Sequence, residues 1–369
     1  MILYYYYRIS PNAGKVSLRR KIKHCSAIIL LFLQAALALA DTSLSGYASI
    51  IAGRVIDGDE FLADYPKTGV YDSDWSFSPD TSFGIQLKSD INEELDLIIQ
   101  VISNGASGYD IELDWAYVSY QFNTEFSLQA GRKRLPLYYY SDFFDVGYAY
   151  YWIRPPADNY TWQISNYNGL SLLYQPELAE WDVLLNLYVG REDSVDNELL
   201  SMLMSASVDE TWKNMVGFVA ELSKDWIELR ATFMQGELDR TVNDIITEQN
   251  VKQKFSGISA NFYFYNFTIL SEFNQYHRDE SDIHVDTQML SIGYHINNFT
   301  PHITHSSFIQ EENSAGGDEN HETFSVGLRW DFNKTTALKI QYDKVRDKGV
   351  NIPVLGDSKA ISLGMDLVF

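Results

Sequence analysis

The chain has little cysteine, no long apolar segment beyond its first forty residues, and few positive charges. Its single cysteine is Cys25, so residues 41–369 hold no thiol that an oxidising compartment could pair. These residues contain no run of about 20 apolar side chains, which excludes a transmembrane helix there. They carry 22 Lys and Arg against 50 Asp and Glu, once the six cations of residues 1–40 are removed, a formal charge of −28. Such acidity argues against nucleic-acid binding, which needs a basic footprint.

The first forty residues predict an export signal. They hold six Lys and Arg and no acid, and then an almost unbroken apolar run from Ala27 to Leu39. That run is too short to span a bilayer as a helix, and it ends in the small-residue pattern of a cleavage site. We interpret residues 1–40 as a signal peptide. Because the part from Val16 onward would suffice as a signal, residues 1–15 are a candidate misplaced start.

The remaining residues alternate between apolar and polar side chains. Sixteen such segments, mostly nine to twelve residues long, begin near residues 44, 81, 95, 111, 126, 167, 181, 211, 226, 252, 267, 285, 299, 322, 336 and 358. A tilted strand needs about that length to cross a bilayer. Short polar turns, such as 90–93 and 265–266, alternate with mostly longer loops, such as 57–80 and 237–251. The pattern predicts an all-β, transmembrane, antiparallel up-and-down β-barrel of about 16 strands over residues 41–369, with both termini at the short-turn end.

The two faces of each predicted strand differ in kind. In the final segment Leu363, Leu367 and Phe369 share one face, while Ser362 and Asp366 share the other. A soluble β-sandwich also alternates, but two sheets then share the apolar face inside the fold. Small and charged residues on the polar face suit a water-filled lumen instead. Aromatic residues at strand ends fit the interfacial girdle of a membrane barrel.

One stretch interrupts the alternation. Residues 131–160 read GRKRLPLYYYSDFFDVGYAYYWIRPPADNY and lie between the segments beginning near 126 and 167. A connection this long within a compact domain usually has a function. It is rich in aromatic residues and stiffened by prolines, which argues against a solvated surface loop. We predict that this third external loop folds into the lumen and narrows it. Its aromatic side chains either stack on sugars or pack the loop against the wall, and their polar tips favour packing.

Two parts of the chain resemble a known family. The ending ISLGMDLVF, with Phe369 last, resembles the carboxy-terminal assembly signal of outer-membrane proteins, and residues 131–160 resemble those of gammaproteobacterial porin-like proteins. Residues 41–369 are similar to a sixteen-stranded, trimeric Gram-negative porin. The resemblance implies passive diffusion of small hydrophilic solutes and ions through a water-filled barrel in the outer membrane. It also implies a homotrimer in contact with lipid and lipopolysaccharide, whose Phe369 the barrel assembly machinery recognises.

The resemblance further implies that acids of the loop face basic residues of the wall. The expected constriction consists of Arg132, Lys133, Arg134, Asp142 and Asp145. Strict alternation from Phe126 points Lys133 into the lumen and Arg132 out, whereas the resemblance favours Arg132. A bulge at Gly131 would reconcile the two. Charges expected on the lumen wall are Arg54, Lys88, Glu112, Asp114 and Arg230.

Other functions stay open beside the general porin. A channel selective for a sugar or an anion would use the aromatic and basic residues of 131–160. A barrel hydrolase would need a nucleophile beside a base, but no serine lies in a recognisable nucleophile motif. His302 and His305, three apart in a strand, face opposite sides. We therefore predict no enzymatic activity, no metal and no cofactor. A non-conducting receptor barrel would need a plug, and the first predicted strand begins almost at residue 41.

Overall fold

The computed structural model describes residues 41–279, 283–312, 319–349 and 356–369. The predicted signal peptide, residues 1–40, lies outside the described residues. The described chain forms sixteen long antiparallel strands. They are β1 (Asp41–Asp57), β4 (Ser82–Asp90), β5 (Leu95–Asn104), β6 (Ile111–Gln121), β7 (Phe126–Arg134), β8 (Asn166–Tyr174), β10 (Trp181–Ser194), β11 (Val208–Lys224), β12 (Ile227–Val242), β13 (Ile245–Phe264), β14 (Phe267–Arg278), β15 (Ile283–Tyr294), β16 (Phe299–Glu312), β17 (Asn320–Asn333), β18 (Thr336–Asp347) and β19 (Ser358–Val368).

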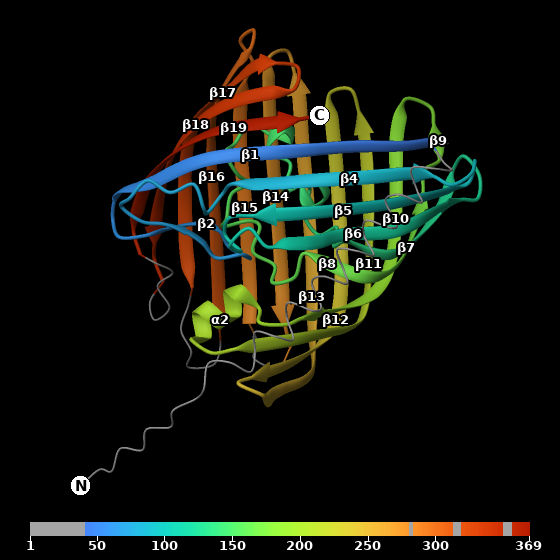
Figure 1. Ribbon diagram of the computed structural model, residues 1–369, viewed down its shortest axis with the longest axis horizontal. Coiled ribbons are helices and arrows are strands. Elements are labelled where there is room, and N and C mark those ends of the chain that lie inside the picture. Colours follow the sequence, from blue (N-terminus) through green and yellow to red (C-terminus); the bar gives the residue numbers. More distant parts are fainter. Residues whose placement is uncertain (1–40, 280–282, 313–318, 350–355) are drawn as a thin grey trace, which may run out of the picture.

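Each long strand pairs with its neighbours in the sequence, and β1 closes the sheet by pairing with both β4 and β19. In Figure 1 the strands β1 and β4 to β7 cross the front of the barrel, and β11 to β17 run behind them. Closure leaves no sheet edge, as a structure in lipid requires. The predicted strand number and up-and-down order are confirmed. The described residues include no helix long and apolar enough to cross a membrane.

The smaller elements lie in the connections. They are the hairpin of β2 (Phe61–Asp64) and β3 (Gly69–Tyr71), the two-residue β9 (Glu177–Leu178) beside β10, the 3-10 turns η1 (Ser141–Phe143) and η2 (Gly147–Ala149), and the helix α2 (Glu198–Met204). The predicted short turns connect β4 to β5, β6 to β7 and every second pair thereafter. Both ends of the described barrel lie beside these turns, because Asp41 is opposite Asp90 at the β4–β5 turn and the Val368 amide donates to Thr335 in the β17–β18 turn.

Burial is inverted relative to that of a soluble fold. Small and charged side chains on one face of the strands are buried: Ser362 is 0 % and Asp366 1 % exposed. Leu363, between them in β19, is 44 % exposed, and Ile258 of β13 is 61 % exposed. Water would penalise such an apolar exterior, whereas lipid tails would not. The predicted faces of β19 are confirmed.

Candidate functional site

Residues 135–165, here called loop 135–165, connect β7 to β8 and make several polar contacts with the opposite side of the barrel. The Tyr151 hydroxyl donates to Ser291 Oγ of β15 over 2.8 Å, and Trp152 Nε1 donates to Thr304 Oγ1 of β16 over 2.8 Å. The Ile153 amide donates to Gln341 Oε1 of β18 over 2.9 Å. These strands lie about half of the barrel away from β7 and β8 in the strand order. The loop therefore packs on buried wall side chains far from its own ends.

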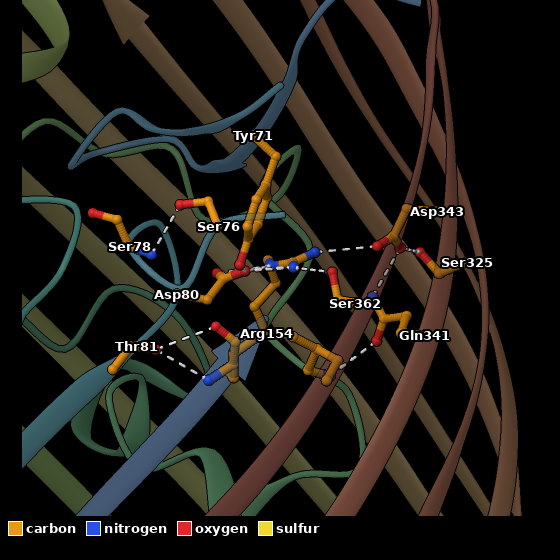
Figure 2. A network of polar contacts seen from close by, with 12 residues as sticks. Tyr71, Ser76, Ser78, Asp80, Thr81, Arg154, Ser325, Gln341, Asp343 and Ser362 are labelled. Carbon is orange, nitrogen blue, oxygen red and sulfur yellow. Dashed lines mark hydrogen bonds and ion pairs between the residues drawn. The ribbon is translucent and has the colours of Figure 1, made fainter. Parts of the chain in front are cut away.

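The strongest of these contacts is made by Arg154 (Figure 2). Its Nε lies 2.9 Å from both oxygens of Asp80, and Nη1 lies 3.1 Å from Asp343 Oδ2. Its Nη2 donates to Ser362 Oγ over 2.8 Å, and the Tyr71 hydroxyl donates to Asp80 over 2.8 Å. Burial by itself lowers the pKa of Arg154, but Asp80 and Asp343 overcome this effect and raise it. The cation joins loop 135–165, the connection after β1, and strands β18 and β19.

Three wall cations also hold the loop by its backbone carbonyls. Arg329 donates to the oxygens of Tyr148 and Tyr150 over 2.7 and 2.8 Å. Arg230 donates to Pro136 and Leu137, and Lys339 donates to Gly147 and Trp152. Lys339 is in turn 2.8 Å from Asp366. Hydrogen bonds with a charged donor are stronger than neutral ones, so these cations fix the path of the loop.

The aromatic side chains of the loop serve mainly in packing. Tyr138, Tyr150, Tyr151 and Trp152 are at most 6 % exposed. Tyr138 packs edge-on against Phe255 of β13, with ring centroids 5.4 Å apart. The packing interpretation therefore holds for these four residues, and a sugar cannot reach their faces.

A second charged cluster lies near the start of the loop. Arg134 Nη2 is 3.3 Å from Asp114 Oδ2 and pairs directly with Asp145, and Lys67 Nζ lies 3.9 Å from Asp145 Oδ1. Burial raises the pKa of Asp145, but Arg134 and Lys67 outweigh burial and hold the pKa below its usual value. Two of the predicted residues, Arg134 and Asp145, thus meet as expected. Their charges are compensated within the protein rather than free.

Arg134 lines a cavity on either side of the loop. The one toward the short turns is bounded by Trp115, Tyr117, Lys133 and Asp142, with Glu221 and Arg230 on the far side. The one toward the longer loops is bounded by Lys67, Glu112, Arg132, Glu192 and Glu198. Lys133 and Asp142, both predicted for the constriction, thus share the first cavity. The Lys133 ammonium lies 5.3 Å from the centre of the Tyr117 ring.

The bulge considered at Gly131 is absent, but Arg132 does line a cavity of the barrel. Strand β7 pairs with β6 and β8 without a bulge through Gly131, which takes a φ of 140° and keeps the register. A Cβ on Gly131 would lie 2.3 Å from the Ala116 oxygen, which explains why glycine is there. Arg132 lies opposite Asn168, and its Nη1 pairs at 2.7 Å with Glu192 of β10. Both side chains line the cavity toward the longer loops, together with Arg134.

Arg54 was predicted to line the lumen wall, and this prediction is wrong. Strand β1 turns Tyr47, Ser49 and Ile51 inward, and all three are buried. Arg54 has the opposite parity and lies beside Ile361 on the lipid-facing side. The first bulge of β1 comes only after Val55, so nothing shifts the alternation before Arg54.

The other four wall predictions fall on the inward face. Lys88 lies 3.0 Å from Asp90 and 3.3 Å from Asp96, near the short turns. Glu112 lines the cavity toward the longer loops. Asp114 and Arg230 contact Arg134 and the loop backbone, as described above.

Sequence reasoning missed the residues that anchor the loop most firmly: Arg154, Asp80, Asp343, Lys339 and His321. His321 Nδ1 lies 2.5 Å from Asp158 of the loop. A signal existed for Asp343 and Lys339, because each is a charge on the inward face of a strand that otherwise spans lipid. Within the described ranges, no three His, Cys, Asp or Glu side chains gather as a metal site.

Comparisons with known proteins agree with this geometry. The sequence pattern of the Gram-negative porin family matches residues 26–350. Among solved structures, OmpF of Salmonella typhi in complex with daunomycin shares 14 % identity at a TM-score of 0.61, covering 90 % of this chain and 98 % of that one. The outer-membrane protein OmpT of Vibrio cholerae, in vitro folded and in trimer form, shares 10 % identity at a TM-score of 0.55, covering 89 % and 99 %. Its loop L8 deletion mutant shares 12 % identity at 0.57, with the same coverage. No curated protein matches the chain.

Proposed function

The chain belongs to the Gram-negative porin family, and on that premise we propose that solutes pass between loop 135–165 and the wall of β6, β7, β8 and β10. Porins allow passive diffusion, so the protein is an outer-membrane channel for small hydrophilic solutes and ions. The remaining wall, from β12 through β19, is covered by the loop through the anchors at Arg230, Arg329, Lys339 and Arg154. Only the uncovered sector remains for water and solutes.

A single observation supports this path: one residue, Arg134, lines a cavity on each side of the loop. We take the path between the two cavities to be narrowest at the residue that they share. We place the constriction there, with Lys133, Arg134, Asp142 and Asp145 from the sequence prediction and Asp114 in addition. Arg132 is left out because it lines only the cavity toward the longer loops, where it pairs with Glu192. Charges act strongly at such a point because little water screens them.

The test is electrical. Purified protein in a planar bilayer should show discrete conductance steps in potassium chloride. Asp114→Asn removes a negative charge and should lower the cation-to-anion permeability ratio. The ratio is measured by the reversal potential under a salt gradient. The matched control is Asp182→Asn, a charge beside the turn before β10 that lines neither cavity. Equal shifts in both variants would contradict the proposed path.

A channel selective for a sugar or an anion is the second candidate. It is supported by Trp115 and Tyr117, which present aromatic faces to the cavity that also holds Lys133 and Asp142. Aromatic faces and polar groups together suit a hydroxylated solute. Current interruptions by an added sugar acid that are absent with potassium chloride alone would favour it. Unbroken current at millimolar sugar acid would favour the general porin.

Several partners complete the proposal. The OmpT neighbour's trimer form supports a homotrimer, and the exposed apolar faces support contact with outer-membrane lipid and lipopolysaccharide. Phe369, 69 % exposed at the end of the last strand, is the proposed signal for the barrel assembly machinery. Residues 1–40 are the proposed signal peptide. We further propose that the barrel has no catalytic activity, which a lipase and protease assay on the purified channel would check.

A further inference from the structure

Positive charge gathers on the lipid-facing side of the barrel near the long-loop ends of β1, β18 and β19. Lys344 of β18 and Lys359 of β19 are direct cross-strand partners. Arg54 lies one strand further, beside Ile361. The cluster is completed by Arg346 and Lys348, which follow Lys344 at alternate positions. Five cations in one place are unusual in residues 41–369, which hold 22 Lys and Arg against 50 acids.

The orientation of these side chains follows from their neighbours. On β18 the inward residues Lys339, Gln341 and Asp343 are buried against loop 135–165. The residues between them face out, and Ile340 is 42 % exposed. Along this outward face the order is Ile340, Tyr342, Lys344, Arg346. An apolar, then aromatic, then cationic order is that of a strand leaving the hydrocarbon layer and entering the headgroup layer.

Within the described residues the cluster holds more cations than acids. Lys359 pairs with Asp57, and Glu322 lies 3.5 Å from Arg346 and 2.7 Å from Lys348. In the part of the chain that the structure describes, neither Lys344 nor Arg54 has a carboxylate within ion-pair distance. Like charges directly across a strand pair destabilise a sheet. Asp57 compensates one charge of the Lys344–Lys359 pair, so the pair keeps a net positive charge that an anion from outside the chain would neutralise.

We propose that this cluster binds the phosphate groups of a lipid headgroup in the outer leaflet of the outer membrane. The inference rests on the proposed function only in taking the barrel to lie in that membrane, with its longer loops outside. A solute in the lumen cannot reach these side chains, because the barrel wall separates them from it. Ammonium and guanidinium groups are suited to phosphate, through charge and hydrogen bonding together. Several cations on adjacent strands suit a headgroup with more than one phosphate, such as that of lipopolysaccharide.

The test measures binding of bisphosphorylated lipid A to the folded protein in detergent. The double variant Lys344→Gln with Lys359→Gln should bind lipid A about 30-fold more weakly, because it removes two cations that attract the anionic headgroup. The control pair is Lys252→Gln with Lys254→Gln, which removes two outward-facing lysines from β13. That pair should change the affinity less than about twofold, since it lies outside the cluster. A dephosphorylated lipid A with the same acyl chains should bind all three proteins equally.

Three results would overturn the proposal. The first is an equal loss of affinity in the two lysine pairs. The second is an equal loss for the dephosphorylated lipid, which would mean that phosphate is not what the cluster binds. The third is a change of oligomeric state with unchanged lipid binding, which would assign the surface to another copy of this chain. Every variant should keep its conductance in potassium chloride and its heat-modifiable mobility. Loss of the mobility shift would indicate a failure to fold, and loss of conductance would indicate a failure of the proposed porin function.

Discussion

Arg134 lies just before loop 135–165 and Arg154 lies in its second half, and each is a buried arginine paired with two aspartates. Arg154 pairs with Asp80 and Asp343, and it joins two loops to the wall of β18 and β19. Arg134 pairs with Asp114 and Asp145, and it lines a cavity on either side. The same chemistry thus serves attachment at one end and, in our proposal, the solute path at the other. What differs is the space around the pair.

The largest expected effect comes from Arg154→Leu. Removing one partner of a buried ion pair leaves Asp80 and Asp343 uncompensated, which costs about 3–5 kcal/mol. Because the barrel is closed without this contact, we expect the loop to detach rather than the strands to separate. Limited proteolysis should cut within residues 135–165, and the conductance should become larger and noisier.

Two variants control for that result. Arg191→Leu removes an arginine whose side chain is 61 % exposed and pairs with Asp193, so it should cost under about 1 kcal/mol. Arg154→Leu combined with Asp80→Asn and Asp343→Asn removes the orphaned charges and should restore part of the protease resistance. A loop that stays protected in the single variant would mean that Arg154 is not the principal anchor.

Arg134→Leu should alter selectivity instead of attachment. It leaves Asp114 and Asp145 without their cation beside both cavities, so cations should be favoured. A charge effect of about 1 kcal/mol changes a permeability ratio about fivefold. The reversal potential under a potassium chloride gradient measures the ratio, and Arg134→Lys, which keeps the charge, should stay close to the parent. If Arg154→Leu shifted the ratio equally, the distinction between the two arginines would fail.

The sequence predicts the barrel far better than it predicts this distinction. Alternation is a local property, so the faces of Leu363 and Ser362 can be predicted from the neighbouring residues alone. The pairing of Arg154 with Asp80 and Asp343 joins residues 74 and 189 positions apart. No local period encodes such a contact. Alternation predicts that Asp366 of β19 faces the lumen, but it does not predict that Asp366 pairs with Lys339.

The error at Arg54 has a physical cause. Arg54 was expected on the lumen wall, whereas the parity of β1 places it beside Ile361 on the outward face. It lies near the long-loop end of its strand, where water and headgroups begin and an outward charge is tolerated. In β7 parity alone is not a sufficient guide, because Arg132 and Arg134 have the same parity and both line the cavity toward the longer loops. The bulge considered at Gly131 is absent from the register.

Neighbouring cations of β7 provide a finer test of the same contrast. Lys133 lines the cavity that it shares with Asp142, whereas Arg132 pairs with Glu192 in the cavity toward the longer loops. Lys133→Gln should therefore raise the cation-to-anion permeability ratio, by less than Arg134→Leu because water reaches this cavity. Arg132→Gln should change the ratio less than Lys133→Gln, because Arg132 lies away from the proposed constriction. Reversal potentials for the two single variants decide it, and the opposite order would move the constriction toward the longer loops.

The smallest expected effect concerns acid. Arg134 and Lys67 outweigh burial and lower the pKa of Asp145 from its ordinary value of 3.8. A carboxyl group with a depressed pKa in the folded state contributes its stabilisation above the ordinary pKa and loses it as the pH falls through the depressed value. The charge at Asp145 should thus persist from pH 7 to below about pH 4, and its share of the selectivity should stay constant over that range.

Permeability ratios recorded between pH 7 and pH 3 for the parent and for Asp145→Asn provide the measurement. The difference between the two proteins should be flat to about pH 4 and should shrink only below it, because protonation then makes the parent resemble the variant. A difference that vanished between pH 5 and pH 7 would mean that Asp145 lacks its cations there, and that the Arg134 cluster is open where we describe it as paired.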